Sequence, residues 1–350
     1  MGEHAQRVVT LASPPSTRIA RAPARVNLIG DHTDYTGGLV LPMAIDRWTE
    51  VSVHPIDEAV VRLSSAIDDL PAVVPLDVDD PSALMPNWAR YVAGVVAEVR
   101  PSGGLEGTVE SNVPAGAGLS SSAALEIACA LAMGASADDP LALALLCQRA
   151  EHRAVGVPSG IMDQLASAAG VEDHALLIDC HSLVTTPTPL PPAEEVEVMV
   201  IHSGQQRALA VSAYAERVAQ CAAAELIVGP LRLAALSDLL AIADPMVRAR
   251  ARHVVSENAR VRAFVEALAG GDVTAAGRLM DASHESLRVD YAVSTEVLDA
   301  LCGRLRAIPG VLGARLTGAG FGGCVVALCR PGAINEGWRV RAVGGAHLAE

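Results

Sequence analysis

The spacing of apolar and polar positions divides the chain into strand-like and helix-like stretches. Strands are predicted over residues 18–28, 38–55, 174–180, 196–202, 311–317 and 323–329. Helices are predicted over 87–99, 118–134, 140–155, 161–170, 208–226, 245–269, 273–287 and 294–307. The Pro-rich run TPTPLPPA (186–193) separates two of the predicted strands and is the candidate domain boundary.

A glycine-rich turn precedes one predicted helix in the stretch VPAGAGLSSSAALEIA (113–128). Glycines let the backbone approach a ligand closely, and the first amides of a helix have no partner within the helix, so this order favours an anion such as phosphate. The Lys that ends a Walker loop is missing, because all 26 basic residues of the chain are Arg. The alternative is an ordinary turn that leads into a buried Ala-rich helix.

A second glycine loop, GAGFGG (318–323), matches the spacing of the dinucleotide-binding fingerprint. That fingerprint requires a helix after the loop, whereas CVVALC continues here as a predicted strand. The context predicts a hairpin-like loop and leaves a plain structural turn open.

Acidic residues near turns are the next candidates for chemistry, since phosphoryl transfer needs a metal ligand, a base and a cation. Glu151 and Asp163 lie on two predicted helices joined by the turn GVPSG (156–160), which could bring both carboxylates to one cleft. Each could instead be a solvated surface acid. The stretch RVNLIGDHTDY (25–35) gathers four charged or titratable residues near a Gly turn, which suggests recognition of hydroxyl groups; these are Arg25, Asp31, His32 and Asp34. By itself, His32 could equally be a satisfied core histidine.

Composition limits the classes of function. The chain has 350 residues, 51% of them hydrophobic, enough for a large core and for two domains. Its net charge of -14 disfavours a nucleic-acid partner. Seven Cys without a CxxC pair predict reduced thiols in a cytoplasmic protein. No apolar run approaches the roughly 18 residues that span a bilayer, so no membrane partner is expected.

In their order, these stretches resemble the galactokinases, within the superfamily of galactokinase, homoserine kinase, mevalonate kinase and phosphomevalonate kinase. The resemblance covers nearly the whole chain. It rests on RVNLIGDHTDYTGG (25–38), NWARYVAGV (87–95), PAGAGLSSSAALE (114–126), AEHRAVGVPSGIMDQ (150–164), SHESLRVDYAVSTEVLDAL (283–301) and LTGAGFGGCVVAL (316–328).

The resemblance implies an α+β fold, with a ribosomal-protein-S5-domain-2-like N-terminal domain (1–192) and a ferredoxin-like C-terminal domain (193–350). It implies an ATP- and Mg²⁺-dependent kinase of the C1 hydroxyl of D-galactose, and a monomer is expected. Asp163 would be the base and Arg25 its neighbouring cation, while Ser122 and Glu151 would hold Mg²⁺. Sugar hydroxyls would be bound by Asp31, His32, Thr33, Asp34, Gly160 and Tyr214. ATP would be bound by Trp88 near the adenine and by the phosphate loop, Gly116, Ala117, Gly118, Leu119, Ser120, Ser121 and Ser122.

Two stretches depart from the family pattern. Asp31 stands where the family usually has Glu, one methylene longer. The segment HSGQQRALAVSAYAERV (202–218) keeps Tyr214 and Arg217 but lacks the usual Asn-Ser or Asp-Ser and the basic cluster. These departures leave open a kinase of another sugar, such as a galactose derivative. A non-catalytic sugar sensor on the same fold is a second rival, against which the intact phosphate loop, Glu151 and Asp163 argue.

Overall fold

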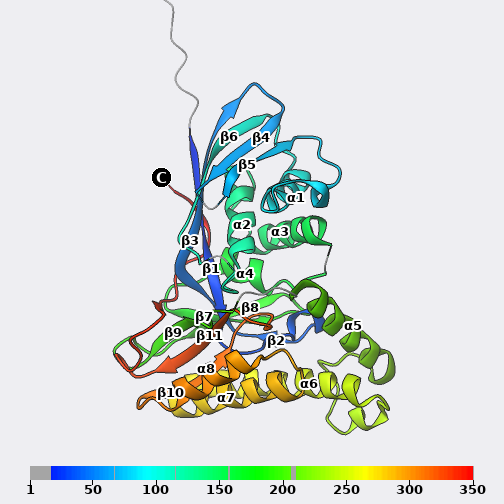
Figure 1. Ribbon diagram of the computed structural model, residues 1–350, viewed down its shortest axis with the longest axis vertical. Coiled ribbons are helices and arrows are strands. Elements are labelled where there is room, and N and C mark those ends of the chain that lie inside the picture. The colour runs from blue at the N-terminus through cyan, green and yellow to red at the C-terminus, as the bar shows by residue number, and fades with distance from the viewer. Residues whose placement is uncertain (1–16, 67, 115, 157, 206–209, 350) are drawn as a thin grey trace, which may run out of the picture.

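The structure is a computed structural model that describes residues 17–349, apart from 67, 115, 157 and 206–209. Its upper half in Figure 1 is built on a six-stranded sheet with strand order β13-β1-β3-β6-β4-β5. Of the neighbouring pairs, only β4 and β6 run parallel. The strands are β1 (Arg18–Asn27), β3 (Pro42–Ile56), β4 (Val60–Ser65), β5 (Asp68–Pro75), β6 (Gly104–Ser111) and β13 (His347–Ala349).

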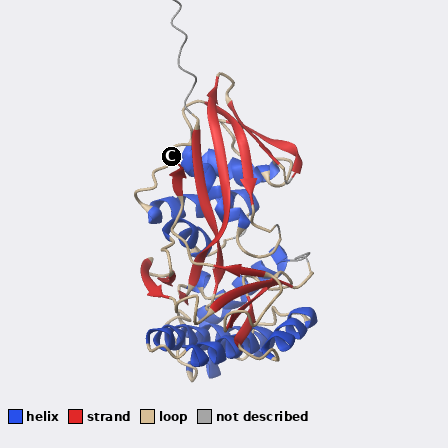
Figure 2. Ribbon diagram, turned by 90° about the vertical axis from the view of Figure 1, so that its left-hand side faces the viewer, coloured by secondary structure: helices blue, strands red, loops and turns tan. Residues whose placement is uncertain are grey.

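Four helices cover one face of this sheet, and Figure 2 shows the other face without a helix over it. They are α1 (Ala89–Val99), α2 (Ser121–Ala132), α3 (Pro140–Val155) and α4 (Met162–Ala169). The sequence sets the ends of α3, because Asp139 caps it by accepting from the amide of Ala142 and Gly156 closes it at φ 71°. A Cβ at Gly94 would lie 2.2 Å from the carbonyl oxygen of Ala150, so glycine lets α1 approach α3 closely beside Glu151.

The lower half holds an antiparallel sheet with order β10-β11-β9-β12, covered by helices at the base of Figure 1. Its strands are β9 (Glu197–His202), β10 (Val311–Leu316), β11 (Cys324–Cys329) and β12 (Trp338–Val340). The helices are α5 (Ala210–Val228), α6 (Pro245–Ala269), α7 (Val273–Val289) and α8 (Glu296–Arg306). A three-stranded sheet of β2 (Leu39–Val40), β7 (His174–Asp179) and β8 (Val184–Pro189) completes the three sheets, and three short 3-10 helices lie at Asp34–Thr36, Pro81–Ala83 and Asp238–Ala241.

The α+β class predicted from the resemblance is confirmed, and so is the hairpin-like second glycine loop, since β10 and β11 pair antiparallel around it. The reading of 186–193 purely as a connection is wrong, because its first half belongs to β8. Pro187 and Pro189 fit there because β8 is the edge strand of its sheet. The boundary at 192/193 stays a prediction.

The pattern also missed β4, β5 and β6. In β6, a Cβ at Gly104 would lie 1.8 Å from the carbonyl oxygen of Glu58, and one at Gly107 would lie 1.8 Å from that of Ser52. These glycines are required by neighbouring backbone, yet they remove the alternating side chains from which a strand is predicted.

Candidate active site

Arg25 and Asp163 form a two-pronged ion pair at the centre of the site. Arg25 lies near the end of β1, and its Nε and Nη2 donate to the two carboxylate oxygens of Asp163 at 2.7 and 2.6 Å. Arg25 is buried, whereas 28% of the Asp163 side chain is exposed. Asp163 is the second residue of α4, where the helix dipole also favours a negative charge. A carboxylate is thus held in place while one side stays open to a ligand.

The first glycine loop closes around this pair. Arg25 Nη1 donates to the carbonyl of Gly118 at 2.7 Å, and the hydroxyl of Ser120 donates to Asp163 at 2.6 Å. Gly118 has φ 80° and Ser120 has φ 62°, a left-handed conformation that non-glycine residues rarely adopt. The side chains of Ala117 and Leu119 are buried in the core, so the loop offers its backbone to a ligand.

Ser122 and Glu151 meet at the start of α2. The Ser122 hydroxyl donates to Glu151 Oε1 at 3.2 Å, while Glu151 Oε2 accepts from Ser159 at 2.7 Å and from Gln164 at 2.9 Å. Among the described residues, no group of three His, Cys, Asp or Glu could hold a metal. One hydroxyl and one carboxylate fit Mg²⁺, which keeps waters and takes its remaining ligands from substrate phosphates.

A hollow of about 250 Å³ lies beside Ser121 and Ser122 and is lined also by Trp88 and Tyr91. The indole nitrogen of Trp88 donates to the carbonyl of Leu70 at 3.2 Å, which fixes the ring at the wall. An aromatic wall next to a helix N-terminus suits a base whose phosphates lie on the glycine loop.

A second hollow, of about 130 Å³, is lined by Asp163, and we call it the charged cleft. The structure brings eight predicted site residues to its wall: Arg25, Asp31, His32, Asp34, Glu151, Gly160, Asp163 and Tyr214. The wall also contains four residues for which no role was predicted: Ser159, Met162, Gly318 and Ala319.

Asp34 lies against Gly160, where a Cβ would stand 1.9 Å from its Oδ2. Burial and then the carboxylate of Asp163 raise the pKa of Asp34 to about 7. Glycine at 160 is therefore required by the close approach of Asp34, and the cleft holds one carboxyl that gains its charge near neutral pH.

His32 is neutral, because burial and then the nearby His253 lower its pKa to about 3. Its Nε2 lies 3.2 Å from the carbonyl oxygen of Ala319 and therefore carries the proton. Its Nδ1 accepts from the hydroxyl of Tyr35 at 3.0 Å. Both ring nitrogens thus have protein partners, and a sugar hydroxyl would have to share or replace one of them.

Thr33 is also predicted to bind substrate, but its hydroxyl donates to the carbonyls of Gly30 and Leu39 at 2.8 and 2.7 Å. The residue is fully buried and does not line the cleft. Its side chain shapes the turn that carries Asp31 and Asp34, and we leave it out of the substrate contacts.

Three family models match along the chain. Residues 10–55 match the galactokinase galactose-binding signature, residues 89–171 the GHMP kinases N terminal domain, and residues 264–340 the GHMP kinases C terminal model. The galactokinase of Chloroflexus aggregans is 45% identical over 338 residues, which cover 92% of this chain and 86% of that protein. The chain belongs to the galactokinases.

A galactokinase phosphorylates galactose, and GHMP kinases use ATP. Another relative, the galactokinase of Roseiflexus sp., is 45% identical over 331 residues, which cover 89% of this chain and 83% of that protein. The crystal structure of Lactococcus lactis galactokinase complexed with galactose superposes with a TM-score of 0.85 at 30% identity, covering 95% of each chain. Methanococcus jannaschii mevalonate kinase shares the fold, with a TM-score of 0.69 at 19% identity over 94% of this chain and 99% of that one.

The main residue that sequence reasoning missed is Arg315, at the end of β10. It is fully buried and forms an ion pair with Asp31, 284 positions earlier in the chain. Gly318 donates its amide to the other oxygen of Asp31 at 2.8 Å. The motif LTGAGFGG predicts a glycine loop but assigns no role to Arg315, which directly precedes it. The one indication in the sequence is that a charged Arg stands within a run of strand residues.

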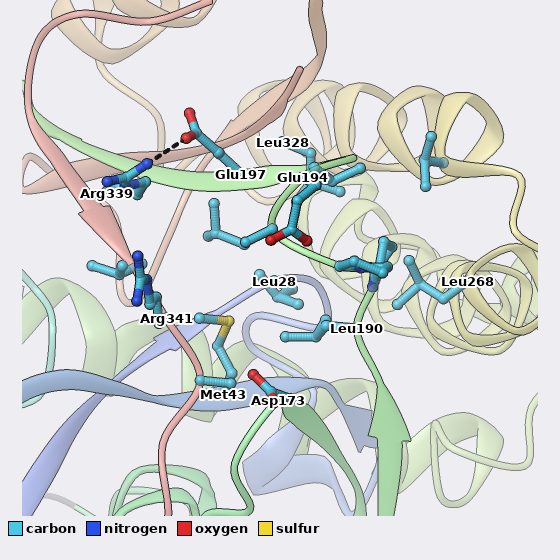
Figure 3. Close-up of a pocket in the computed structure, with 18 of the residues that line it drawn as sticks. Leu28, Met43, Asp173, Leu190, Glu194, Glu197, Leu268, Leu328, Arg339 and Arg341 are labelled. Atoms are coloured by element: carbon cyan, nitrogen blue, oxygen red, sulfur yellow. Dashed lines mark hydrogen bonds and ion pairs between the residues drawn. The ribbon is translucent and has the colours of Figure 1, made fainter. Parts of the chain in front are cut away.

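A larger cavity of about 480 Å³ lies between the two halves, away from these residues, and we call it the apolar cavity (Figure 3). Its floor consists of core side chains such as Leu28, Met43, Phe264 and Leu328. Charged residues stand around it, including an ion pair of 2.7 Å between Glu197 and Arg339. None of the predicted site residues lines it.

No helix among the described residues has the length and apolar character needed to cross a membrane.

Proposed function

We propose that this galactokinase transfers the γ-phosphoryl group of ATP to the C1 hydroxyl of D-galactose and forms galactose 1-phosphate. The observation that carries the proposal is the Arg25–Asp163 pair, which lies between the glycine loop on one side and the charged cleft on the other. A phosphate donor and a hydroxyl acceptor bound in these two places would meet at the open side of Asp163.

In the proposed mechanism Asp163 accepts the proton of the C1 hydroxyl as the phosphoryl group is transferred. Arg25 fixes the position of this carboxylate through two charge-assisted hydrogen bonds. Position matters here because an ionised carboxylate is a weak base, and holding the reacting groups close compensates for that weakness.

The backbone of residues 116–122 and the first turn of α2 would hold the ATP phosphates, with the adenine near Trp88. Ser122 and Glu151 would hold Mg²⁺, which neutralises charge on the β- and γ-phosphate oxygens when bound. Asp31, His32, Asp34, Gly160 and Tyr214 would contact the sugar.

We further propose a monomer that works in the cytoplasm, with a domain boundary at 192/193. In support of the cytoplasm, all seven Cys are free thiols. Light scattering coupled to gel filtration tests the monomer, which a stable dimer at micromolar concentration would contradict.

The deciding experiment is a coupled assay of ADP release with Mg·ATP across hexoses, their amino derivatives, mevalonate and homoserine. D-galactose is expected to give the highest kcat/KM, with phosphate at C1 by ³¹P NMR of the product. A clearly higher kcat/KM for another acceptor would contradict the substrate assignment. The absence of turnover with every acceptor, together with galactose binding, would favour a sugar sensor.

A further inference from the structure

The end of β10 and the second glycine loop are bound directly to the turn that carries the sugar-site residues. The hydroxyl of Thr317 donates to the carbonyl of Asn27 at 3.0 Å and accepts from its amide at 3.3 Å. Two residues farther along, the carbonyl of Ala319 accepts from His32 at 3.2 Å. The C-terminal half therefore supplies one wall of the charged cleft. Its hydrogen bonds to Asn27 and His32 also fix the position of the opposite wall.

Within this contact, Arg315 is a buried cation whose ion pair is with Asp31, and it also lies near the buried carboxylate of Glu257, whose pKa it helps to lower. Its Nη2 donates to Asp31 Oδ2, while its Nε and Nη1 have no hydrogen-bond partner in the part of the chain that the structure describes. A buried guanidinium with unpaired N–H groups costs stability, and an apolar residue of similar length would fill the same space at a lower cost. Packing alone therefore does not account for an Arg at position 315.

The electrostatics of the cleft give a reason for it. Asp31, Asp34 and Asp163 all line the cleft, and Asp163 and Asp31 both raise the pKa of Asp34, after burial. Arg25 pairs with Asp163 and Arg315 pairs with Asp31, whereas Asp34 has no ion pair among the described residues. Arg25, from the N-terminal half, thus fixes the carboxylate of Asp163, and Arg315, from the C-terminal half, fixes that of Asp31.

The geometry of Asp31 shows what Arg315 controls. Oδ1 accepts from the Gly318 amide at 2.8 Å and Oδ2 accepts from Arg315, so both oxygens are held from the side of the C-terminal half. A carboxylate oxygen can accept more than one hydrogen bond, so lone pairs remain for a ligand in the cleft. Without Arg315, one anchor of this carboxylate is lost, and Asp31 lies buried beside the carboxyl groups of Asp34 and Asp163 without its ion pair.

We propose that Arg315 is a positioning residue for sugar recognition, acting through Asp31, whose carboxylate it holds at the cleft wall to accept a sugar hydroxyl. The proposal rests on the proposed function, because it places the sugar in the charged cleft. Arg315 does not line the cleft and does not touch the reacting groups. Its effect should therefore fall on sugar affinity and leave the chemical step largely unchanged.

The test compares Arg315→Met and Arg315→Lys with the wild type in steady-state kinetics and in calorimetric titration with galactose. Losing a hydrogen bond between charged groups should raise the KM and Kd for galactose about 10- to 100-fold in Arg315→Met. The KM for ATP and kcat should stay within about threefold. Arg315→Lys keeps a point charge but not the planar fork, so we expect a smaller rise in the galactose KM.

A double variant separates positioning from folding. Asp31→Asn combined with Arg315→Met removes both buried charges, so Tm should recover relative to Arg315→Met, while the galactose KM stays high. Arg339→Met is the matched control, because it breaks a 2.7 Å ion pair with Glu197 on the same half without reaching the cleft. Its galactose KM should equal that of the wild type.

The proposal is overturned if Arg315→Met lowers Tm but leaves the galactose KM unchanged, or if the KM values for galactose and ATP rise together. Should Arg315→Met not fold, an unchanged galactose KM in Arg315→Lys contradicts it equally. Failure of the proposed function would look different, since the wild type itself would then prefer another acceptor. The same variants would then be measured with that acceptor, where an unchanged KM again contradicts the role of Arg315.

Discussion

The apolar cavity and the charged cleft differ in size and in chemistry. The apolar cavity is about 480 Å³ and the charged cleft about 130 Å³, yet the residues matched to phosphoryl transfer lie at the smaller one. The floor of the larger cavity consists of buried aliphatic and aromatic side chains from the core of the molecule. The cleft instead places four carboxyl groups together, those of Asp31, Asp34, Glu151 and Asp163, one of which, Asp34, has its pKa raised to about 7. Volume alone therefore does not locate a catalytic site, whereas acidic groups held near one another against their mutual repulsion do.

The strongest test of this comparison is Asp163→Asn. General-base catalysis typically contributes about 100- to 10,000-fold, so kcat should fall by at least about 100-fold while galactose still binds. Steady-state assays with calorimetry measure both quantities. Asp173→Asn, at the apolar cavity, is the matched control and should keep the wild-type kcat. If Asp163→Asn kept more than about a tenth of kcat, Asp163 would orient the sugar and would not be the base.

Glu151→Gln should have the next largest effect. Substitutions around metal ligands typically cost about 10- to 100-fold in metal affinity, so the Mg²⁺ concentration for half-maximal activity should rise by at least about tenfold. Binding of Mn²⁺·ATP, followed by electron paramagnetic resonance, gives a readout independent of turnover. A collapse of galactose affinity with unchanged metal affinity would remove Glu151 from the metal role.

Asp34→Asn should change the pH dependence of stability. Folding raises the pKa of Asp34 from 3.8 to about 7, so between these values the native state keeps a proton that the unfolded chain has lost. The stability of the wild type due to this group therefore falls as pH rises through that window. We expect the Tm of the variant to exceed that of the wild type by a few degrees at pH 8, and the difference to shrink toward pH 4.

Asp173→Asn is again the control, because this carboxylate is exposed at the apolar cavity. Its Tm relative to the wild type should not change between pH 4 and pH 8. A constant difference for Asp34→Asn as well would mean that Asp34 is charged throughout this range.

The smallest effect on catalysis is expected for Leu268→Ala, at the wall of the apolar cavity (Figure 3). Removing this largely buried side chain should lower the free energy of unfolding by about 2 kcal/mol. Both kcat and the two KM values should stay within about twofold. Urea denaturation and steady-state assays measure these quantities, and a large change in the galactose KM would show that the cavity is coupled to the sugar site.

The sequence predicted best the features that are determined by residues close to one another in the chain. The turn at 25–35, the glycine loop at 116–122 and the bounds of α3 are each specified by adjacent residues, and the structure has them where the pattern placed them. The single short turn between their helices also predicted that Asp163 and Glu151 could reach one cleft, and both line the charged cleft.

Features that depend on distant contacts could not be predicted. The partner of Asp31 lies 284 residues away, and no spacing rule connects Arg315 with it. Thr33 is a local exception: it matches a binding motif, yet its hydroxyl donates to the carbonyls of Gly30 and Leu39 in its own turn. The β6 strand contains glycines required by neighbouring strands, so its own residues carry little strand signal.

The position of β13 at the end of the chain means that β1 gains its neighbour on one edge only late in synthesis. β1 lies between β13 and β3, so residues 347–349 cover the outer edge of the strand that carries Arg25. On the ribosome, about 320 residues are added after β1 before this edge strand exists, which takes tens of seconds at typical synthesis rates. During that time the edge of β1 is open to pairing with another nascent chain. Co-translational chaperones that shield exposed strands would therefore matter most for the first part of this chain to be synthesised.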